Sequence, residues 1–214
     1  MVEKPIIFSS EMVRAILHGR KTQTRRIYKG PDPLQCRHVD GKLQEHRGYP
    51  IGHVDVKSPY AVGDRLWVRE TWWDLGHVEN GKWQGRIDGH TCRPKYVASC
   101  SYPYIDNEKM GIESMRPRQM PWRKTTLIKS TWRKRPSIHM PRWAARIFLI
   151  VKSVRVERLQ EISPQDIWSE GYPDMAHLVP MHWFRALWDS LNTKRGYGWE
   201  VNPWVWVYEF EWEK

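Results

Sequence analysis

A lysine and a threonine lie three residues apart in a basic segment near the start of the chain, Gly19-Arg20-Lys21-Thr22-Gln23-Thr24-Arg25-Arg26. A threonine hydroxyl becomes an effective nucleophile only when a neighbouring base removes its proton. A lysine can be that base when burial or nearby cations lower its pKa, and the arginines of the segment would supply such cations. The segment therefore predicts either a Thr24 nucleophile with Lys21 as its base, or a solvated basic edge that binds phosphate groups.

A carboxylate that could pair with Lys21 lies far along the chain, at Glu170. Ser163-Pro164 is typical of a helix start, with a hydroxyl cap and a proline at the first helical position, and Gly171 is typical of a helix end. Glu170 then lies in the last turn, where the helix dipole disfavours a negative charge unless a cation lies nearby. A pair between Lys21 and Glu170 is one interpretation, and an ordinary exposed helix acid is the other.

The elements around these residues follow from hydrophobic periodicity and from turn residues. Lys21 and Thr24 would face opposite sides of a straight strand, so chemistry between them requires a bend. Breaker residues predict loops or short hairpins over 30–58, and a long inserted segment over 74–136. The order of elements indicates an α+β fold built on a small β-barrel. The expected helices cover 10–18, 164–170 and 181–191, and the expected strands cover 65–73, 96–100, 145–157 and 204–212.

The composition restricts the class of protein. The chain has 214 residues, a net charge of +11 and fourteen tryptophans against four phenylalanines. No apolar run approaches the roughly 18 residues that a membrane span needs, and residues 1–6 contain no signal-peptide core. We therefore expect a cytoplasmic protein with no membrane partner. The positive charge favours polyanionic partners, although net charge does not indicate a fold.

One basic stretch, 116–135, contains no acidic residue and includes two tryptophans, Trp122 and Trp132. Cations that bind phosphates beside aromatic rings that stack on bases are the usual means of binding single-stranded nucleic acid. The stretch therefore favours RNA as an alternative partner. The basic residues assigned to this role are Arg116, Arg118, Arg123, Lys124, Arg133 and Arg135.

The three cysteines indicate no disulfide framework, since their number is odd. Two Cys-x-His-type pairs, Cys36-x-His38 and His90-x-Cys92, could together complete a zinc site. Their one-residue spacers are not those of common zinc sites, and free cysteines in loops are the alternative reading. Neither a metal nor a cofactor is expected in the chemistry of Lys21 and Thr24.

Four blocks in order resemble the ASCH domain family. They are the basic segment after a short helix, then Gly63-Asp64-Arg65-Leu66-Trp67-Val68-Arg69-Glu70, then Leu159 to Gly171, and finally a Trp-rich helix with a closing Tyr208-Glu209-Phe210 strand. The resemblance covers about 1–29, 60–73 and 137–214. It implies a single PUA-like domain over 1–214, a small β-barrel with flanking helices, and long insertions at about 30–59 and 74–136. Ser137 to Trp143 is similar to larger phage-type and bacterial members.

The resemblance implies an enzyme. Some small members are N4-acetylcytidine amidohydrolases, whose proposed catalytic Lys, Thr and Glu fall here on Lys21, Thr24 and Glu170. Such an enzyme acts without a metal on a modified nucleoside, and releases cytidine. The alternative that the resemblance leaves open is an RNA-binding module, with ribonuclease activity reported within the family. The residues expected to contact the nucleoside are Arg26, Trp67, Glu70 and Trp143.

Overall fold

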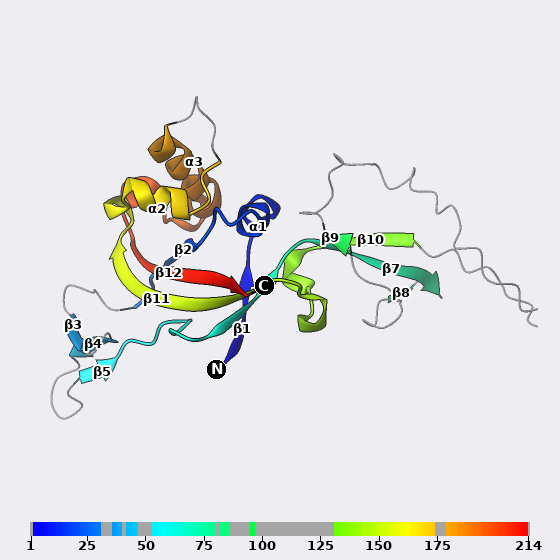
Figure 1. Cartoon of the computed structure of the whole chain (residues 1–214), viewed down its shortest axis with the longest axis horizontal. Helices are drawn as coiled ribbons and strands as arrows, with labels where there is room; N and C mark the ends of the chain where they lie inside the picture. Colours follow the sequence, from blue (N-terminus) through cyan, green and yellow to red (C-terminus); the bar gives the residue numbers. More distant parts are fainter. Residues whose placement is uncertain are drawn as a thin grey trace, which may run out of the picture. The chain divides into compact units, whose positions relative to one another are not determined.

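The computed structural model describes residues 2–30, 36–39, 42–46, 53–79, 82–85, 95–96, 131–173 and 179–213. The chain divides into two compact units, each built from separate segments of sequence. The first comprises Met1–Lys4, Ala15–Trp67 and Ile147–Lys214, and the second comprises Pro5–Arg14 and Val68–Arg146. The fold class is mixed α+β, as the sequence predicts, with sheets as the main component and few helices (Figure 1).

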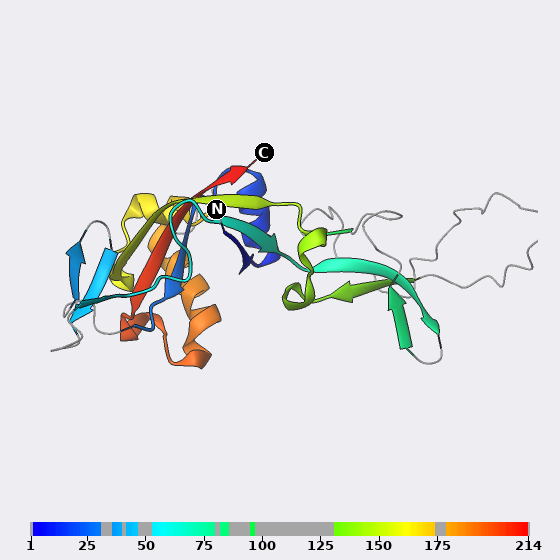
Figure 2. The ribbon, with the colours of Figure 1, turned by 90° about the horizontal axis from the view of Figure 1, so that it is seen from below.

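The largest sheet has five strands in the order β1-β6-β11-β12-β2. Its longest pairing is antiparallel, between β11 and β12, with a register shift between Val151 and Ser153. These two strands run side by side in both views (Figures 1 and 2). Among the described residues the sheet is open, with β1 and β2 at its edges, and it does not close into a barrel. The strands are β1 (Glu3–Ile7), β2 (Gln23–Ile27), β6 (Arg65–Arg69), β11 (Phe148–Arg158) and β12 (Trp204–Glu213).

Helices α2 (Pro164–Ser169) and α3 (Pro180–Asn192) lie against one face of this sheet (Figure 1). The start of α2 agrees with its sequence signal, because the Ser163 hydroxyl accepts a hydrogen bond from the Asp166 amide at 3.1 Å. A shared core joins these helices to β12 and stabilises the packing through burial of large apolar side chains. Its fully buried members are Leu159, Ile162, Ile167, Tyr172, Phe184, Trp188, Val205 and Val207.

Both faces of β12 are covered along most of its length. Val205 and Val207 belong to the core under the helices, while Trp206 and Tyr208 alternate with them and are also buried. On that second face Trp206 packs against Tyr28, and Tyr208 packs edge-on against Tyr60, with ring centroids 5.2 and 5.0 Å apart. The strand predicted over 204–212 is therefore confirmed as β12.

Two expectations about the strands need correction. The strand predicted over 65–73 is two strands, because β6 ends at Arg69 and β7 (Trp72–Glu79) begins a different sheet. Residues 74–136 are also more than an inserted loop, since β7 pairs with three further strands in the second unit. Those partners are β8 (Lys82–Gly85), β9 (Lys95–Tyr96) and β10 (Thr131–Arg135).

The remaining elements are smaller. Helix α1 (Ser10–Leu17) forms where the sequence predicts it. The hairpins expected over 30–58 form as a three-stranded antiparallel sheet of β3 (Cys36–Val39), β4 (Lys42–His46) and β5 (His53–Asp55). The strand expected over 96–100 overlaps β9 only at Tyr96, and 97–100 lie outside the described residues. No helix in the described part of the chain is long and apolar enough to cross a membrane.

Candidate active site

The structure brings Lys21 and Glu170 together. Their backbones form an isolated antiparallel bridge between the start of β2 and the end of α2. The Lys21 ammonium group donates to Glu170 Oε2 at 2.6 Å and to the Glu170 carbonyl oxygen at 2.9 Å. Both side chains are almost fully buried, with 0% of Lys21 and 4% of Glu170 exposed. This is the ion pair that the sequence left as one of two readings.

Two tight turns place this pair. Helix α1 ends at Leu17, Gly19 in the turn that follows has a φ of +72°, and the amides of Arg20 and Lys21 then donate to the Ala15 carbonyl. Gly171 has a φ of +94°, and a Cβ atom there would lie 3.0 Å from Lys21 Cβ and 2.9 Å from Ala15 Cβ. Only glycine accommodates both the left-handed backbone and this close approach. Gly171 is therefore the residue that lets the end of α2 touch Lys21.

Burial lowers the pKa of Lys21 from its ordinary value of 10.5. The charge and hydrogen bond of Glu170 raise that pKa, while the charges of Arg26 and Arg25 lower it further. Desolvation disfavours the charged ammonium form, and neighbouring cations act in the same direction. A lysine in this setting gives up its proton more readily than one in water, which is what a general base requires.

The second carboxylate oxygen of Glu170 binds Arg25. Arg25 Nη1 donates to Glu170 Oε1 at 3.1 Å and to the Gln23 side-chain oxygen at 2.7 Å. The other donors of Arg25 bind Glu157 Oε1, at 3.0 Å from Nε and 2.6 Å from Nη2. Arg25 Nη2 also lies 3.1 Å from Asp166 Oδ2. Arg25 is thus shared by three carboxylates, one from β11 and two from the α2 region.

A second arginine, Arg155, binds the outer side of the same carboxylates. It pairs with Glu157 Oε2 and Asp166 Oδ1, each at 3.1 Å, and with Glu209. Gln23 Nε2 donates to Asp166 Oδ1 at 3.0 Å, and Gln23 therefore links Arg25 to a carboxylate that Arg155 also binds. The Arg155 side chain is 36% exposed, in contrast to the fully buried Arg25.

Thr24 lies on the opposite face of β2 from Arg25. It pairs with Tyr208 in the sheet, whereas Arg25 pairs with Val207 on the helix side. Thr24 is 2% exposed, and the two hydrogen bonds of the Lys21 ammonium group described above go to Glu170 and not to Thr24. Lys21 precedes the first residue of β2, so the alternation of the strand does not apply to it. Chemistry between Lys21 and Thr24 would therefore require the two side chains to come within hydrogen-bond reach when a substrate binds.

Arg26 and two tyrosines surround the Thr24 side of the sheet. Tyr60, Glu170 and Tyr208 lie close enough to act electrostatically on Arg26, whose pKa is lowered by burial. Tyr208 Oη and Ser58 Oγ share a hydrogen bond of 2.9 Å. Burial raises the pKa of Tyr208 to about 12, and burial raises the pKa of Tyr60 as well. Sequence reasoning missed both residues: Ser58 lies in a segment read as an insertion, and Tyr60 lies at the start of the block that follows it.

The other residues expected to contact a nucleoside have different surroundings. Trp67 lies on β6, opposite Phe148 of β11. Glu70 is 1% exposed and accepts two hydrogen bonds from Arg146, at 2.8 and 3.0 Å, within the second unit. Trp143, 46% exposed, packs edge-on against Trp72 of the same unit. Glu70 thus has a complete structural role as the partner of Arg146.

Most residues of the alternative RNA surface lie outside the described part of the chain. Arg116, Arg118, Arg123 and Lys124 are among them. Arg133 is exposed on β10, whereas Arg135 pairs with Asp74 at 3.1 Å. Cys36 and His38 lie on β3, and His90 and Cys92 lie outside the described residues. Within the described ranges no three metal-binding side chains gather.

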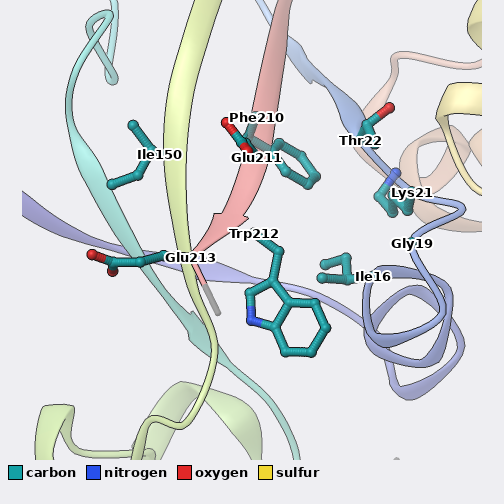
Figure 3. Close-up of a pocket in the computed structure, with 9 residues that line it drawn as sticks. All are labelled: Ile16, Gly19, Lys21, Thr22, Ile150, Phe210, Glu211, Trp212 and Glu213. Carbon is teal, nitrogen blue, oxygen red and sulfur yellow. The ribbon is translucent and has the colours of Figure 1, made fainter.

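An open hollow of about 610 Å³ borders Lys21 in the first unit. Lys21, Thr22, Gly19 and Ile16 line one side, and the end of β12 lines the other (Figure 3). The acids at its rim are paired, Glu211 with Lys152 at 2.7 Å and Glu213 with Arg65 at 2.6 Å. Thr24 is not part of its lining, so this hollow is separate from the Thr24 face of β2.

The arrangement provides a buried lysine with a lowered pKa, Lys21, and a carboxylate held at both oxygens, Glu170. It also provides a buried threonine, Thr24, at the second position of β2. A base-assisted nucleophile uses side chains of these types, with the base and the hydroxyl within hydrogen-bond reach. Comparison of the chain with protein-family models, with curated proteins and with solved structures gave no match.

Proposed function

We propose that this protein is an amidohydrolase that removes the acyl group from N4-acylated cytosine nucleosides such as N4-acetylcytidine. The observation that carries the proposal is the buried contact of 2.6 Å between Lys21 and Glu170, beside the strand that bears Thr24. It agrees with the resemblance of the four sequence blocks to the ASCH domain family. That resemblance also supports the finer fold proposal, a PUA-like barrel elaborated from the observed sheet.

In the proposed reaction Thr24 Oγ1 attacks the acyl carbonyl carbon while neutral Lys21 Nζ takes the hydroxyl proton. The tetrahedral intermediate then collapses, and the C–N4 bond breaks as Lys21 returns the proton to the leaving cytosine amine. Water hydrolyses the acyl-threonine in a second round, with Lys21 again the base. Glu170 orients Lys21 throughout and compensates the positive charge that forms on it.

Arg26 is the side chain best placed to stabilise the oxyanion. It shares the Thr24 face of β2, because it pairs with Trp206, two residues before Tyr208 in β12. Arg25 is on the other face and its donors are already bound to carboxylates. A donor aimed at the place where negative charge develops contributes most in a buried site.

The test is release of cytidine from N4-acetylcytidine by purified protein, followed by chromatography. Thr24→Ala and Lys21→Ala should each lower kcat/KM by about 10³-fold or more, because each removes a partner in the same proton transfer. Thr22→Ala is the matched control, since this neighbouring threonine is exposed, and it should retain activity. Inactive wild-type protein, or a Thr24→Ala variant as active as wild type, would overturn the proposal.

A further inference from the structure

We propose that Arg25 is the positioning residue of this site, which holds Glu170 Oε1 so that Oε2 faces Lys21, and whose charge helps Lys21 to release its proton. The inference rests on the proposed function in one respect: neutral Lys21 is taken to be the catalytic base. The hydrogen bonds of Arg25 described above go to carboxylates and to Gln23, and none goes to Lys21 or Thr24. Arg25 acts through Glu170, and it is therefore distinct from the catalytic set.

The geometry shows why Arg25 can fix the orientation of Glu170. The guanidinium group is a rigid planar fork, and here its donors bind Glu157, Asp166, Gln23 and Glu170 at 2.6–3.1 Å. Anchors from β11 and from the α2 region hold it from two sides. Glu170 accepts from this fixed fork at one oxygen and from Lys21 at the other, so its carboxylate plane cannot rotate without losing a charged hydrogen bond.

Several of the described elements contribute charged groups around the pair. The α2 region presents Glu170 and Asp166, and β11 presents Glu157 and Arg155. The Phe184 ring of α3 lies 5.8 Å from the Arg25 guanidinium carbon. The remaining charged groups are Arg26 of β2, Glu209 of β12, and Arg20, which donates to the Gly171 and Tyr172 carbonyls.

The charge of Arg25 has a direct consequence for Lys21. Glu170 carries one negative charge and serves two buried cations. If Arg25 were neutral, that charge would attract the Lys21 ammonium alone, and the repulsion between the two cations would vanish. Both changes favour the protonated lysine, so the loss of Arg25 should raise the pKa of Lys21. Burial remains the largest cause of the lowered value.

The competing view is that Arg25 only fastens β2 to β11 and α2. Such a role predicts a loss of stability when Arg25 is replaced, with no movement of the Lys21 titration. Arg155→Gln is the matched control, because Arg155 binds Glu157 and Asp166 as Arg25 does, while its third carboxylate partner is Glu209 and not Glu170. The titration of Lys21 therefore distinguishes the two roles, whereas a loss of stability is expected from both.

The experiment follows the ¹³Cε chemical shift of Lys21 across pH in ¹³C-lysine-labelled protein, with Lys21→Met to assign the signal. Arg25→Gln should raise the Lys21 midpoint by about one pH unit. Arg25→Met, which removes the charge but fills similar space, should do the same and serves if Arg25→Gln does not fold. Arg25→Lys and Arg155→Gln should leave the midpoint within about half a unit of wild type.

An unmoved midpoint in a folded neutral variant, or an upward shift of about one unit in Arg25→Lys, overturns the inference. The titration needs no substrate, so it tests Arg25 whether or not the protein hydrolyses N4-acetylcytidine. If wild type is active, the ascending limb of its kcat/KM profile should move with the Lys21 midpoint in each variant. If wild type is active but the ascending limb does not move in the variants, the proposed function stands and the role of Arg25 is rejected.

Discussion

Glu170 is the residue on which the site depends, because it is the anion common to two buried cations. Lys21 has Glu170 as its side-chain carboxylate, whereas Arg25 also binds Glu157 and Asp166. The two partners of Glu170 are therefore unequal. Removal of the carboxylate leaves a buried charge without compensation, and removal of Lys21 does not, since Glu170 keeps Arg25.

This asymmetry predicts the order of two stability changes. Glu170→Gln should lower the free energy of unfolding by about 3–5 kcal/mol, the usual effect of breaking a buried ion pair from one side. Lys21→Met should lower it by clearly less, because Glu170 remains paired and the methionine fills similar space. Urea unfolding at neutral pH measures both. Equal losses, or a larger loss for Lys21→Met, would contradict the unequal sharing.

The lowered pKa of Lys21 predicts how deacylation depends on pH. The base must be neutral to accept the Thr24 proton, and its neutral fraction grows as pH rises through its pKa. Because burial holds that pKa below 10.5, kcat/KM should rise with pH and level off before pH 10.5 is reached. Initial rates between pH 6 and 10, corrected for spontaneous hydrolysis, measure the profile. A rate that falls steadily over this range would contradict a lysine base.

The Lys21–Glu170 pair could be predicted from the sequence, but the carboxylates that bind Arg25 beside it could not. The spacing in the basic segment and the helix signals near Ser163 pointed to Lys21 and Glu170. Arg25 was expected as one of the cations near Lys21, and the structure surrounds it with carboxylates from positions 157, 166 and 170. Those partners come from β11 and the α2 region, and no local periodicity connects them to β2.

At the scale of elements, the contact between the end of α2 and Lys21 depends on Gly171. Gly19 has a similar left-handed backbone, but a Cβ atom there would have open space around it. The two glycines therefore separate backbone strain from steric overlap. Each follows the end of a helix, and each lies within a few residues of the same ion pair.

Gly19→Ala should lower the free energy of unfolding by about 1–2 kcal/mol, from backbone strain alone. Gly171→Ala should cost about 1–3 kcal/mol more, because its methyl group would overlap with Lys21 Cβ and Ala15 Cβ. Urea unfolding measures both, and activity should fall further in Gly171→Ala since Lys21 must move. Equal stability losses in the two variants would show that the close approach is unimportant.

The elements with strong local signals were predicted well, and the others were not. Ser163-Pro164 begins α2 with a capping box, and the alternation of Trp204 to Trp212 forms β12. The division of 65–73 at Glu70 escaped prediction because the hydrophobic alternation continues across it. Glu70 follows the last residue of β6 and pairs with Arg146, a residue 76 positions away.

At the scale of the whole molecule, the carboxylates around Arg25 should make stability sensitive to acid. Burial alone would raise the pKa of Asp166, but hydrogen bonds from Gln23 and Ser163 and the charge of Arg25 outweigh it and hold the pKa below 3.8. A carboxyl whose pKa is lower in the folded state stabilises the fold above its unfolded value, and this contribution is lost as pH falls through the folded value.

The melting temperature should therefore decrease as pH is lowered from 6 to 3, and Asp166→Asn should weaken that dependence. The amide introduced by this substitution cannot titrate, so the variant should be less stable at pH 6 and closer to wild type at pH 3. Circular dichroism melts at matched ionic strength measure the difference. A parallel pH dependence in the two proteins would contradict a role for Asp166.

The RNA alternative makes its own prediction for the intact chain. If the basic stretch binds single-stranded RNA, affinity should fall with salt at a slope of about −0.7 per neutralised phosphate. Deletion of 116–130, which spares β10, should then weaken binding and reduce that slope, without changing hydrolysis of the free nucleoside. Fluorescence anisotropy with a labelled oligonucleotide at several salt concentrations measures it. Unchanged binding after the deletion would reject the stretch as the RNA surface.

The large-scale arrangement was only partly predictable. The mixed α+β class followed from the order of elements, but the pairing of β7 with β8, β9 and β10 did not, because Gly- and Pro-rich sequence there favoured a loop. Long-range pairing depends on contacts that single-sequence periodicity does not contain.

The position of β2 at the edge of the sheet sets when the site can exist during synthesis. Among the described strands of the main sheet, β2 has β12 as its single neighbour, so the strand that carries Thr24 is held by Trp204–Glu213. Lys21 and Thr24 leave the ribosome well over a hundred residues before their partners at 170 and 205–209. A nascent chain therefore carries its nucleophile and base unassembled until β12 emerges, and a chain truncated before residue 204 should have neither site nor activity.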